Sequence, residues 1–336
     1  MSTGSAITVV LPCFQAATFL PETLACLPQG ISAIAVDDAS TDGTATLLEA
    51  WRSEDPSHRT VLHHSANQGL GATRNTGWRA AQTEWILFLD ADDVLETGWH
   101  SALAHALAQV SAESTWLWHP YTEWDGQRKR LRQTDRLLQA TDLVTKRLPL
   151  SPSGSLIRRS VLEEVGGWSE SRDLVEDIDF WMRLWQAGHR PQQWSTTPWT
   201  RYRTNVGLTK DVEAHAGKVL GRLDEFVARG WIQASERQEA EAEIWRQVGR
   251  THHKARRWAA ARLAYRRAKP SLKTALLRGL TFIHIPYEAL FPYFTRLLAF
   301  DGLEPQPPRH RLPRGGLLGP GDLHPRPCRY LRGLPL

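Results

Sequence analysis

Three aspartates stand within four positions, directly after an apolar run. Residues 85–95 read WILFLDADDVL, so that Asp90, Asp92 and Asp93 follow a run of five apolar side chains. Carboxylates this close repel one another unless a cation or hydrogen-bond donors offset their charge. Asp favours turns, so a turn after a strand is one interpretation. The other is a divalent-cation site, because Mg²⁺ takes oxygen ligands from carboxylates and from substrate phosphates.

Two further segments place polar side chains where a strand is expected to meet a helix. In VDDASTDGT (residues 36–44) the polar residues form a turn and cap the next helix, or Asp38 accepts the N–H of a nucleobase. In NQGLGATRNTGW (67–78) the third glycine of a dinucleotide fingerprint is missing, which favours a close turn into a helix. Arg74 then lies near the start of that helix, either as a surface residue or beside a diphosphate.

A fourth acidic group opens a later helix. The segment VEDIDFW (175–181) contains Glu176, Asp177 and Asp179. Acids at the start of a helix stabilise its dipole, which is one sufficient explanation for them. A carboxylate placed beside a sugar donor would also serve as a general base, and Asp177 is the candidate for that role.

The first hundred residues must position these side chains, and they alternate between strand and helix patterns. Apolar strands without internal alternation, separated by helices, predict a parallel sheet covered on both faces. Ligands bind at the carboxyl ends of such strands, so the acids that follow two of them are expected to share one site. The predicted strands are 7–12, 31–38, 61–64 and 85–89, and the predicted helices are 18–27, 44–51 and 70–81.

The later chain is irregular at first and then helical. Residues 115–124 predict one strand, and residues 151–168 predict a loop, a short strand and a helix. Residues 173–188 predict a helix of about four turns that ends at Gly188. Residues 236–268 resemble a helical hairpin, which cannot bury its own apolar face and is expected to pack on the body.

Charge divides the chain into an acidic body and a basic end. The residues from Arg246 onward hold 18 Lys+Arg against 4 Asp+Glu, whereas the 245 before them hold 23 against 32. We therefore expect an α/β domain over 1–210, a helical basic extension over 211–300, and a disordered Pro-, Gly- and Arg-rich tail over 301–336. The basic extension is either a solvated face or a surface for anionic membrane lipids.

Several classes of protein are disfavoured by composition. Three cysteines form no disulfide framework, no apolar run is long enough to span a bilayer, and the first residues leave no room for a signal peptide. We therefore expect a cytoplasmic protein, peripheral at the inner face of the plasma membrane if the basic extension binds lipid. The acidic body and the lack of a base-reading module argue against nucleic acid as a partner.

Taken in order, these motifs resemble the inverting family 2 glycosyltransferases of GT-A fold. The segments VVLPCFQ, VDDASTDGT, NQGLGATRNTGW, ILFLDADD, RRSVLEEVGGW and EDIDFWMRL are similar to VVIPxYN, VDDGSTDGT, NxGxxxARNxG, FLDxDD, RRxxxExxGGF and EDxDxxxR. The similarity covers about residues 7–205. It implies a Rossmann-like, mainly parallel sheet with helices on both faces. It also implies transfer of a sugar, with inversion, from a nucleotide-diphosphate sugar to a glycan or lipid-linked saccharide of the cell envelope.

The resemblance also implies roles for individual residues. Asp177 matches the general base of the family. Asp92 matches the main ligand of Mg²⁺ or Mn²⁺, assisted by Asp90, and Asp93 supports their loop. The residues implied in nucleotide-sugar binding, from the nucleobase to the diphosphate, are Pro12, Phe14, Asp38, Arg74, Asp90 and Asp93.

The chain departs from the family patterns at three positions. Gln15 replaces an Asn, Ala39 replaces a Gly, and Asn205 stands where His is common near the metal or diphosphate. Because Asn205 replaces this His, a non-catalytic protein that binds nucleotide sugars is an alternative interpretation. No QxxRW follows the base, which disfavours a processive polymer synthase. A sugar-phosphate nucleotidyltransferase would need a Gly-rich, Arg-bearing loop after the first strand, and PCFQAATF contains no glycine.

Overall fold

The structure of this protein is a computed structural model. All of the described residues lie within a single unit, Met1–Tyr287. The predicted disordered tail, 301–336, is outside them, as is Asn205. The described residues are 6–133, 139–145, 150–172, 175–204, 211–268, 270–282 and 284, with the backbone alone at 272 and 273.

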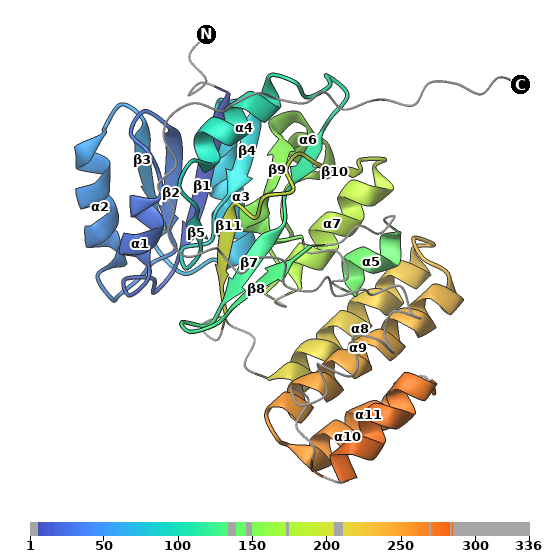
Figure 1. Ribbon diagram of the computed structural model, residues 1–336. Coiled ribbons are helices and arrows are strands. Elements are labelled where there is room, and N and C mark those ends of the chain that lie inside the picture. The colour runs from blue at the N-terminus through green and yellow to red at the C-terminus, as the bar shows by residue number, and fades with distance from the viewer. Residues whose placement is uncertain are drawn as a thin grey trace, which may run out of the picture. The chain divides into compact units, whose positions relative to one another are not determined.

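A seven-stranded sheet forms the centre of the molecule, in the order β10-β6-β9-β4-β1-β2-β3 (Figure 1). Every neighbouring pair is parallel except the two pairs made by β9. A second sheet has the order β5-β11-β7-β8. The strands are β1 Ile7–Cys13, β2 Ser32–Asp37, β3 Arg59–His63, β4 Trp85–Phe88, β5 Val94–Leu95, β6 Trp116–Trp118, β7 Tyr121–Trp124, β8 Lys129–Arg132, β9 Ser155–Arg158, β10 Pro191–Gln193 and β11 Thr200–Arg203.

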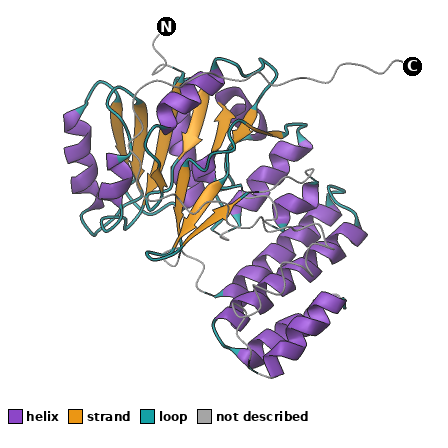
Figure 2. Ribbon diagram, in the orientation of Figure 1, coloured by secondary structure: helices purple, strands orange, loops and turns teal. Residues whose placement is uncertain are grey.

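Helices cover both faces of the large sheet, as Figure 2 shows, and the predicted mainly parallel α/β architecture is confirmed. Their bounds are α1 Leu20–Ala25, α2 Thr44–Glu54, α3 Leu70–Ala80, α4 Trp99–Leu107, α5 Ala140–Val144, α6 Arg159–Val165, α7 Glu176–Gln186, α8 Val212–Ala228, α9 Ala234–Lys254, α10 Trp258–Arg267 and α11 Leu272–Phe282, with a 3₁₀ turn at Pro152–Gly154.

Two hydrophobic cores lie on the two faces of the large sheet. Along β1 the side chains alternate, so that Val9 and Leu11 enter one core and Val10 enters the other. The core with Val9 is covered by α1, α2 and α4, through residues such as Leu48 and Leu103. The core with Val10 is covered by α3, α6 and α7. Burial on both faces explains why the strands read as apolar runs without alternation.

The single strand predicted over residues 115–124 is wrong. The structure divides this segment at His119 and Pro120 into β6, which belongs to the large sheet, and β7, which belongs to the small sheet. Proline has no N–H to donate, so the ladder cannot continue through Pro120. This change of sheet carries β7 toward β11 and hence toward the residues that follow β4.

The C-terminal helices continue the core that covers α7. Phe226 of α8, Trp245 and Val248 of α9 and Ala264 of α10 belong to the same cluster as Phe180 of α7. The predicted hairpin over 236–268 is present as α9 and α10, and it packs on the body as expected. The side chain of Gln247 donates to the carbonyl oxygen of Thr145 at 2.6 Å, which ties α9 to the end of α5.

Gly249 permits the close packing of α9 on α10. A methyl group at this position would overlap the ring of Tyr265, whereas one at Gly221 of α8 would meet open space. We expect Gly249→Ala to lower the free energy of unfolding by about 1–3 kcal/mol through overpacking. Gly221→Ala is the matched control and should raise it by about 0.5–1 kcal/mol, because alanine is the better helix former. Urea denaturation followed by circular dichroism measures both. Equal effects of the two substitutions would contradict the packing argument.

Candidate active site

The carboxyl ends of β1, β2 and β4 bring the predicted acidic segments to one edge of the sheet. Cys13 pairs with Asp37 in the ladder, and Val10 pairs with Phe88, two residues before Asp90. Burial raises the pKa of the Cys13 thiol well above its usual range, and the charges of Asp37 and Asp90 raise it further. Both carboxylates therefore lie near the end of β1, in agreement with the expected position of a ligand site.

Asp93 is a structural member of the aspartate cluster. Its side chain is buried, and it accepts hydrogen bonds from the Ser153 hydroxyl at 2.6 Å and from the backbone N–H of Arg203 at 3.0 Å. Burial raises the pKa of Asp93 well above its usual range, and the charges of Asp90 and Asp92 add to this effect. The carboxylate thus holds the loop after β4 against β11, as the supporting role implied by the resemblance requires.

Asp92 is half-buried, and its carboxylate receives no hydrogen bond from another described residue. Burial raises its pKa to about 6, with a further contribution from the charge of Asp90. A divalent cation would stabilise this carboxylate, since it offsets the repulsion between neighbours. Among the described residues no group of three or more His, Cys, Asp or Glu could hold a metal ion. A cation here would therefore need oxygen ligands from a substrate, as Mg²⁺ often does.

Arg74 is a buried cation that joins two of the predicted motifs. Its side chain is 2% exposed, with Nη2 at 2.7 Å from Asp90 and Nη1 at 3.4 Å from Glu176. Burial opposes its charge, but the Asp90 and Glu176 carboxylates hold its pKa above the usual value. The guanidinium also lies over the Trp168 ring, 4.3 Å from its centroid. The interpretation of Arg74 as a surface residue is therefore wrong.

Asn75, the next residue, fixes the loop that carries Trp168. Its amide donates to the Trp168 carbonyl oxygen at 2.9 Å, and its oxygen accepts the Trp168 N–H at 2.8 Å. Gly71 allows the approach, because a Cβ there would overlap the carbonyl oxygen of Ser169. The ARN and GGW segments therefore form one unit, in which the loop supports the ring beneath Arg74.

The start of α7 presents two carboxylates to this unit. Glu176 is buried, and burial raises its pKa, while Arg74 opposes the increase and the charges of Asp177 and Asp90 reinforce it. Asp177 is half-buried, and its Oδ1 accepts the N–H of Ile178 at 2.9 Å. The charges of Asp177 and Asp90 both raise the pKa of Glu176, so the predicted base lies in the same electrostatic environment as the aspartate cluster.

Asp38 is held by the loop that precedes α3. Its carboxylate accepts hydrogen bonds from the N–H groups of Gln68 at 2.8 Å and Gly69 at 2.9 Å, and His64 Nδ1 lies 2.7 Å from it. The side chain is 3% exposed. These contacts give Asp38 a structural role, and they leave Oδ2 with acceptor capacity for a nucleobase. Its role in reading the base stays a prediction.

The predicted wall of the nucleobase stands at the end of β1. Pro12 is buried within the strand, while Phe14 is 48% exposed just beyond it. Gln15 and Ala39, two of the departures from the family patterns, both adopt positive φ, at 50° and 60°. Asn and Gly tolerate this conformation best, which explains why the patterns have them there. Gln15 compensates through hydrogen bonds with Thr41, at 2.9 and 3.2 Å.

Three residues of the site were missed from the sequence. Ser153 donates to Asp93, and Trp168 lies beneath Arg74. The third, Arg203, donates through Nε to the backbone oxygen of Asp92 at 3.0 Å. The aromatic residue that ends the GGW segment was a signal for Trp168, and the family pattern YRxHxxSxT, similar to the segment around Asn205, has an arginine at the position of Arg203. Ser153 had no such signal, because it contacts the aspartate loop only in the folded chain. The role of Asn205 falls outside the described residues.

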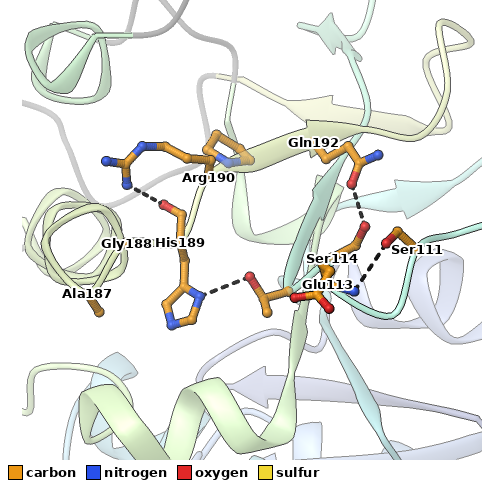
Figure 3. A pocket seen from close by; sticks show the side chains of 10 residues that line it. Ser111, Glu113, Ser114, Ala187, Gly188, His189, Arg190 and Gln192 are labelled. Atoms are coloured by element: carbon orange, nitrogen blue, oxygen red, sulfur yellow. Dashed lines mark hydrogen bonds between the residues drawn. The ribbon is translucent and has the colours of Figure 1, made fainter.

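A separate pocket of about 640 Å³ lies where β6 and β10 begin. Figure 3 shows that its polar side chains pair with one another: His189 with Thr115 at 2.9 Å, and Ser114 with Gln192 at 2.6 Å. β6 is parallel to β4, because both are antiparallel to β9. The pocket is therefore at the opposite edge of the sheet from the aspartates.

Ala39 provides a test of the strained turn after β2. The backbone of an L-residue at φ 60° is strained by about 1–2 kcal/mol, and glycine would remove this strain. Glycine also makes the unfolded chain more flexible, but this lowers stability by only about 0.4–1 kcal/mol. We therefore expect Ala39→Gly to raise the free energy of unfolding by about 0.5–1 kcal/mol. Ala50→Gly, at an exposed position inside α2, is the control and should lower it. Denaturant titration measures both, and a destabilised Ala39→Gly protein would refute the strain.

Arg74 provides a test of the bridge between the motifs. Arg74→Met leaves Asp90 and Glu176 without their buried cation, so we expect a loss of roughly 3–5 kcal/mol in the free energy of unfolding. Adding Glu176→Gln should recover part of that loss, since it removes one of the two stranded charges. Arg79→Met, at an exposed ion pair on the same helix, should change little. Equal melting temperatures for Arg74→Met and Arg79→Met would show that the bridge does not contribute.

Comparison with known proteins agrees with this geometry. Residues 8–166 match the family described as "Glycosyl transferase family 2". The "Pre-mycofactocin glycosyltransferase" of Mycobacterium tuberculosis is 32% identical over 197 residues, which cover 55% of this chain and 40% of that protein. The match thus spans less than half the length of that relative.

Two solved structures have the same fold at low sequence identity. S. aureus TarS 1-349 in complex with UDP-GlcNAc has a TM-score of 0.56 at 18% identity, over 88% of this chain and 92% of that one. Mannosyltransferase PcManGT from Pyrobaculum calidifontis, in complex with GDP-Man and Mn2+, has a TM-score of 0.53 at 18% identity, over 88% of this chain and 84% of that one. Residues 8–166 of this chain are thus similar to the family 2 glycosyltransferases, and its central sheet has the GT-A fold of these two structures.

Proposed function

We propose that this chain is a glycosyltransferase that moves a sugar from a nucleotide-diphosphate sugar to an acceptor hydroxyl, with inversion. The observation that carries the proposal is the Arg74 bridge. The guanidinium of Arg74 pairs with two carboxylates. One is Asp90, in the aspartate cluster, and the other is Glu176, which directly precedes Asp177. These contacts support the proposal of a single site in which one group stabilises a leaving diphosphate and another accepts a proton, as a direct displacement requires.

Asp92 and Asp90 are the residues that would hold Mg²⁺ or Mn²⁺. The raised pKa of Asp92 and the absence of another described residue bonded to its carboxylate support this assignment. When bound, the cation neutralises the charge that develops on the diphosphate as the bond to the anomeric carbon breaks. Asp93 and Arg203 hold the loop in place from beneath, so that the two ligands need not reorganise on binding.

Asp177 is the proposed general base. It is the second residue of α7, whose buried face packs in the core, so that the position of its backbone is fixed. The acceptor hydroxyl loses its proton to Asp177 as its oxygen attacks the anomeric carbon, on the side away from the diphosphate. A carboxylate of ordinary pKa is sufficient for this step, because it accepts the proton only in the transition state.

The donor is proposed to lie between these acids and the end of β1. The exposed ring of Phe14 supplies a face for a nucleobase, with Pro12 behind it and Asp38 near its edge. TarS and PcManGT carry UDP-GlcNAc and GDP-Man in their solved complexes, which supports a nucleoside-diphosphate sugar as the donor class. Arg74 acts here as a positioning residue, since its guanidinium is occupied by carboxylates.

The acceptor is proposed to be a glycan or a lipid-linked saccharide of the cell envelope. None of the described helices is both long and apolar enough to cross a bilayer. We propose a cytoplasmic enzyme that is peripheral at the inner face of the plasma membrane, where lipid-linked acceptors lie. A protein that binds nucleotide sugars without transferring them is the alternative, and it would bind the donor without consuming it.

Substitutions at the two acids should separate binding from catalysis. We expect Asp177→Asn to retain nucleotide binding and to lose transfer or donor hydrolysis by about 10²–10⁴-fold. Asp92→Asn should instead lose the increase in UDP or GDP affinity that Mn²⁺ provides. Isothermal calorimetry with and without Mn²⁺, beside assays of donor consumption, measures the two effects. Asp224→Asn, on the surface of α8, is the control and should leave both unchanged.

Each contrary outcome has a distinct meaning. Normal turnover by Asp177→Asn would move the base to another residue. Donor binding without consumption by the unaltered protein, across UDP- and GDP-sugars and several acceptors, would favour the non-catalytic alternative. Indifference of the protein to every nucleoside diphosphate, with or without Mn²⁺, would refute the proposed site altogether.

A further inference from the structure

The last described helices combine an unusual excess of positive charge with exposed apolar side chains. Residues 254–282, here called the basic hairpin, comprise the end of α9, the whole of α10 and α11, and their connections. Nine Lys or Arg and no Asp or Glu stand in this segment. The nearest acids in the chain are Glu243 before it and Glu288 after it. The nine cations are Lys254, Arg256, Arg257, Arg262, Arg266, Arg267, Lys269, Lys273 and Arg278.

The hairpin buries one side of each helix and exposes the other. On α10 the residues Ala261, Ala264 and Tyr265 are buried, and on α11 Leu277 and Thr281 are buried. Three large apolar side chains on these two helices are exposed instead. These are Leu263, Leu276 and Phe282, at 53%, 37% and 56% exposure. Large apolar side chains of this kind are usually scattered singly on a surface, and here they share one hairpin with the cations.

Cations and apolar groups are interleaved on this surface. Arg266 and Arg267 lie within one helical turn of Leu263, all exposed on α10. The guanidinium of Arg262 donates to the Thr281 carbonyl oxygen at 3.1 Å and lies over the Phe282 ring, 4.8 Å from its centroid. The end of α11 is thereby held against α10, so that Phe282 lies beside a cation.

Acids on the neighbouring helices already have basic partners. Glu243 lies 2.7 Å from Arg246 and 2.9 Å from Arg250, both on α9 itself. Glu213, on α8, lies 2.5 Å from His252. These pairs use cations that precede the hairpin in the chain. None of the described Asp or Glu residues forms an ion pair with the six arginines of the hairpin, so their charge calls for an anionic partner from outside.

We infer that the basic hairpin is a docking surface for an anionic lipid bilayer. Lipid phosphates would meet the arginines, while Leu263 and Phe282 would enter the boundary with the acyl chains, as in interfacial amphipathic helices. Each basic residue near such a surface adds to the attraction, which weakens as salt screens it. A nucleic acid would also attract the cations, but its phosphate surface offers no apolar region for the exposed leucines. This inference is independent of the transfer reaction, and it would bring the site to lipid-linked acceptors.

The experiment compares binding of the full-length protein to phosphatidylcholine vesicles with and without phosphatidylglycerol, by flotation at low and high salt. We expect binding only to the anionic vesicles, and loss of that binding at high salt. Arg257→Glu with Arg266→Glu should weaken binding at least about tenfold. Leu263→Ser with Phe282→Ser should weaken it as well and should remove the penetration measured by monolayer surface pressure. Lys218→Glu on α8 with Arg229→Glu just after that helix makes the same change in charge at two exposed residues, and this variant should bind normally.

Circular dichroism and thermal melting are used to test whether each variant is folded, and UDP or GDP binding is used to test whether the donor site is intact. Absence of binding, or equal binding to neutral and anionic vesicles, would overturn the inference. So would unchanged binding of the Arg257→Glu, Arg266→Glu protein, because cations elsewhere would then be responsible. Tighter binding to a DNA or RNA duplex than to anionic vesicles would assign the surface to nucleic acid instead. Loss of donor binding in the unaltered protein would count against the proposed function alone.

Discussion

The arrangement of the site depends on one buried cation. Arg74 lies almost completely out of water, and it is stable there only because Asp90, Glu176 and the face of Trp168 surround it. Removing a guanidinium from water is unfavourable, so each of these partners must be in place when the chain folds. The consequence is that α3, the loop after β4 and the start of α7 are held at one fixed spacing. Substrate groups would then meet an assembled site.

The acids around this cation differ in environment, and their environments suggest their tasks. Asp93 is buried and bonded to Ser153 and Arg203, so it stabilises the loop. Asp92 is half-buried, and burial together with the charge of Asp90 raises its pKa, so a bound cation would stabilise its carboxylate. Asp177 lies half-buried at the start of a separate helix. One charged residue type can therefore serve as support, as proposed metal ligand and as proposed base within one edge of the sheet.

The helical part of the chain contributes to the site through the core. Its helices α8, α9 and α10 belong to the hydrophobic cluster that buries α7. Arg222 of α8 also approaches Asp179 at 3.8 Å, and Asp179 is bonded to Arg183 at 2.8 Å. The helix that carries the proposed base is thus packed between the sheet and the C-terminal helices. An inferred membrane surface on α10 and α11 would be connected to the site by this packing.

The amino-acid sequence by itself determined the elements and the kind of chemistry. Apolar runs, turn residues and caps act within a few positions of one another, so the strands before Asp38 and Asp90 and the hairpin of α9 and α10 were predictable, and six ordered motifs indicated the family. Tertiary structure alone decided that Arg74 is buried, that Ser153 bonds to Asp93, and that residues 115–124 divide between two sheets. These outcomes depend on contacts between segments far apart in the chain, and no local pattern of hydrophobicity or charge specifies which distant partner a side chain will meet.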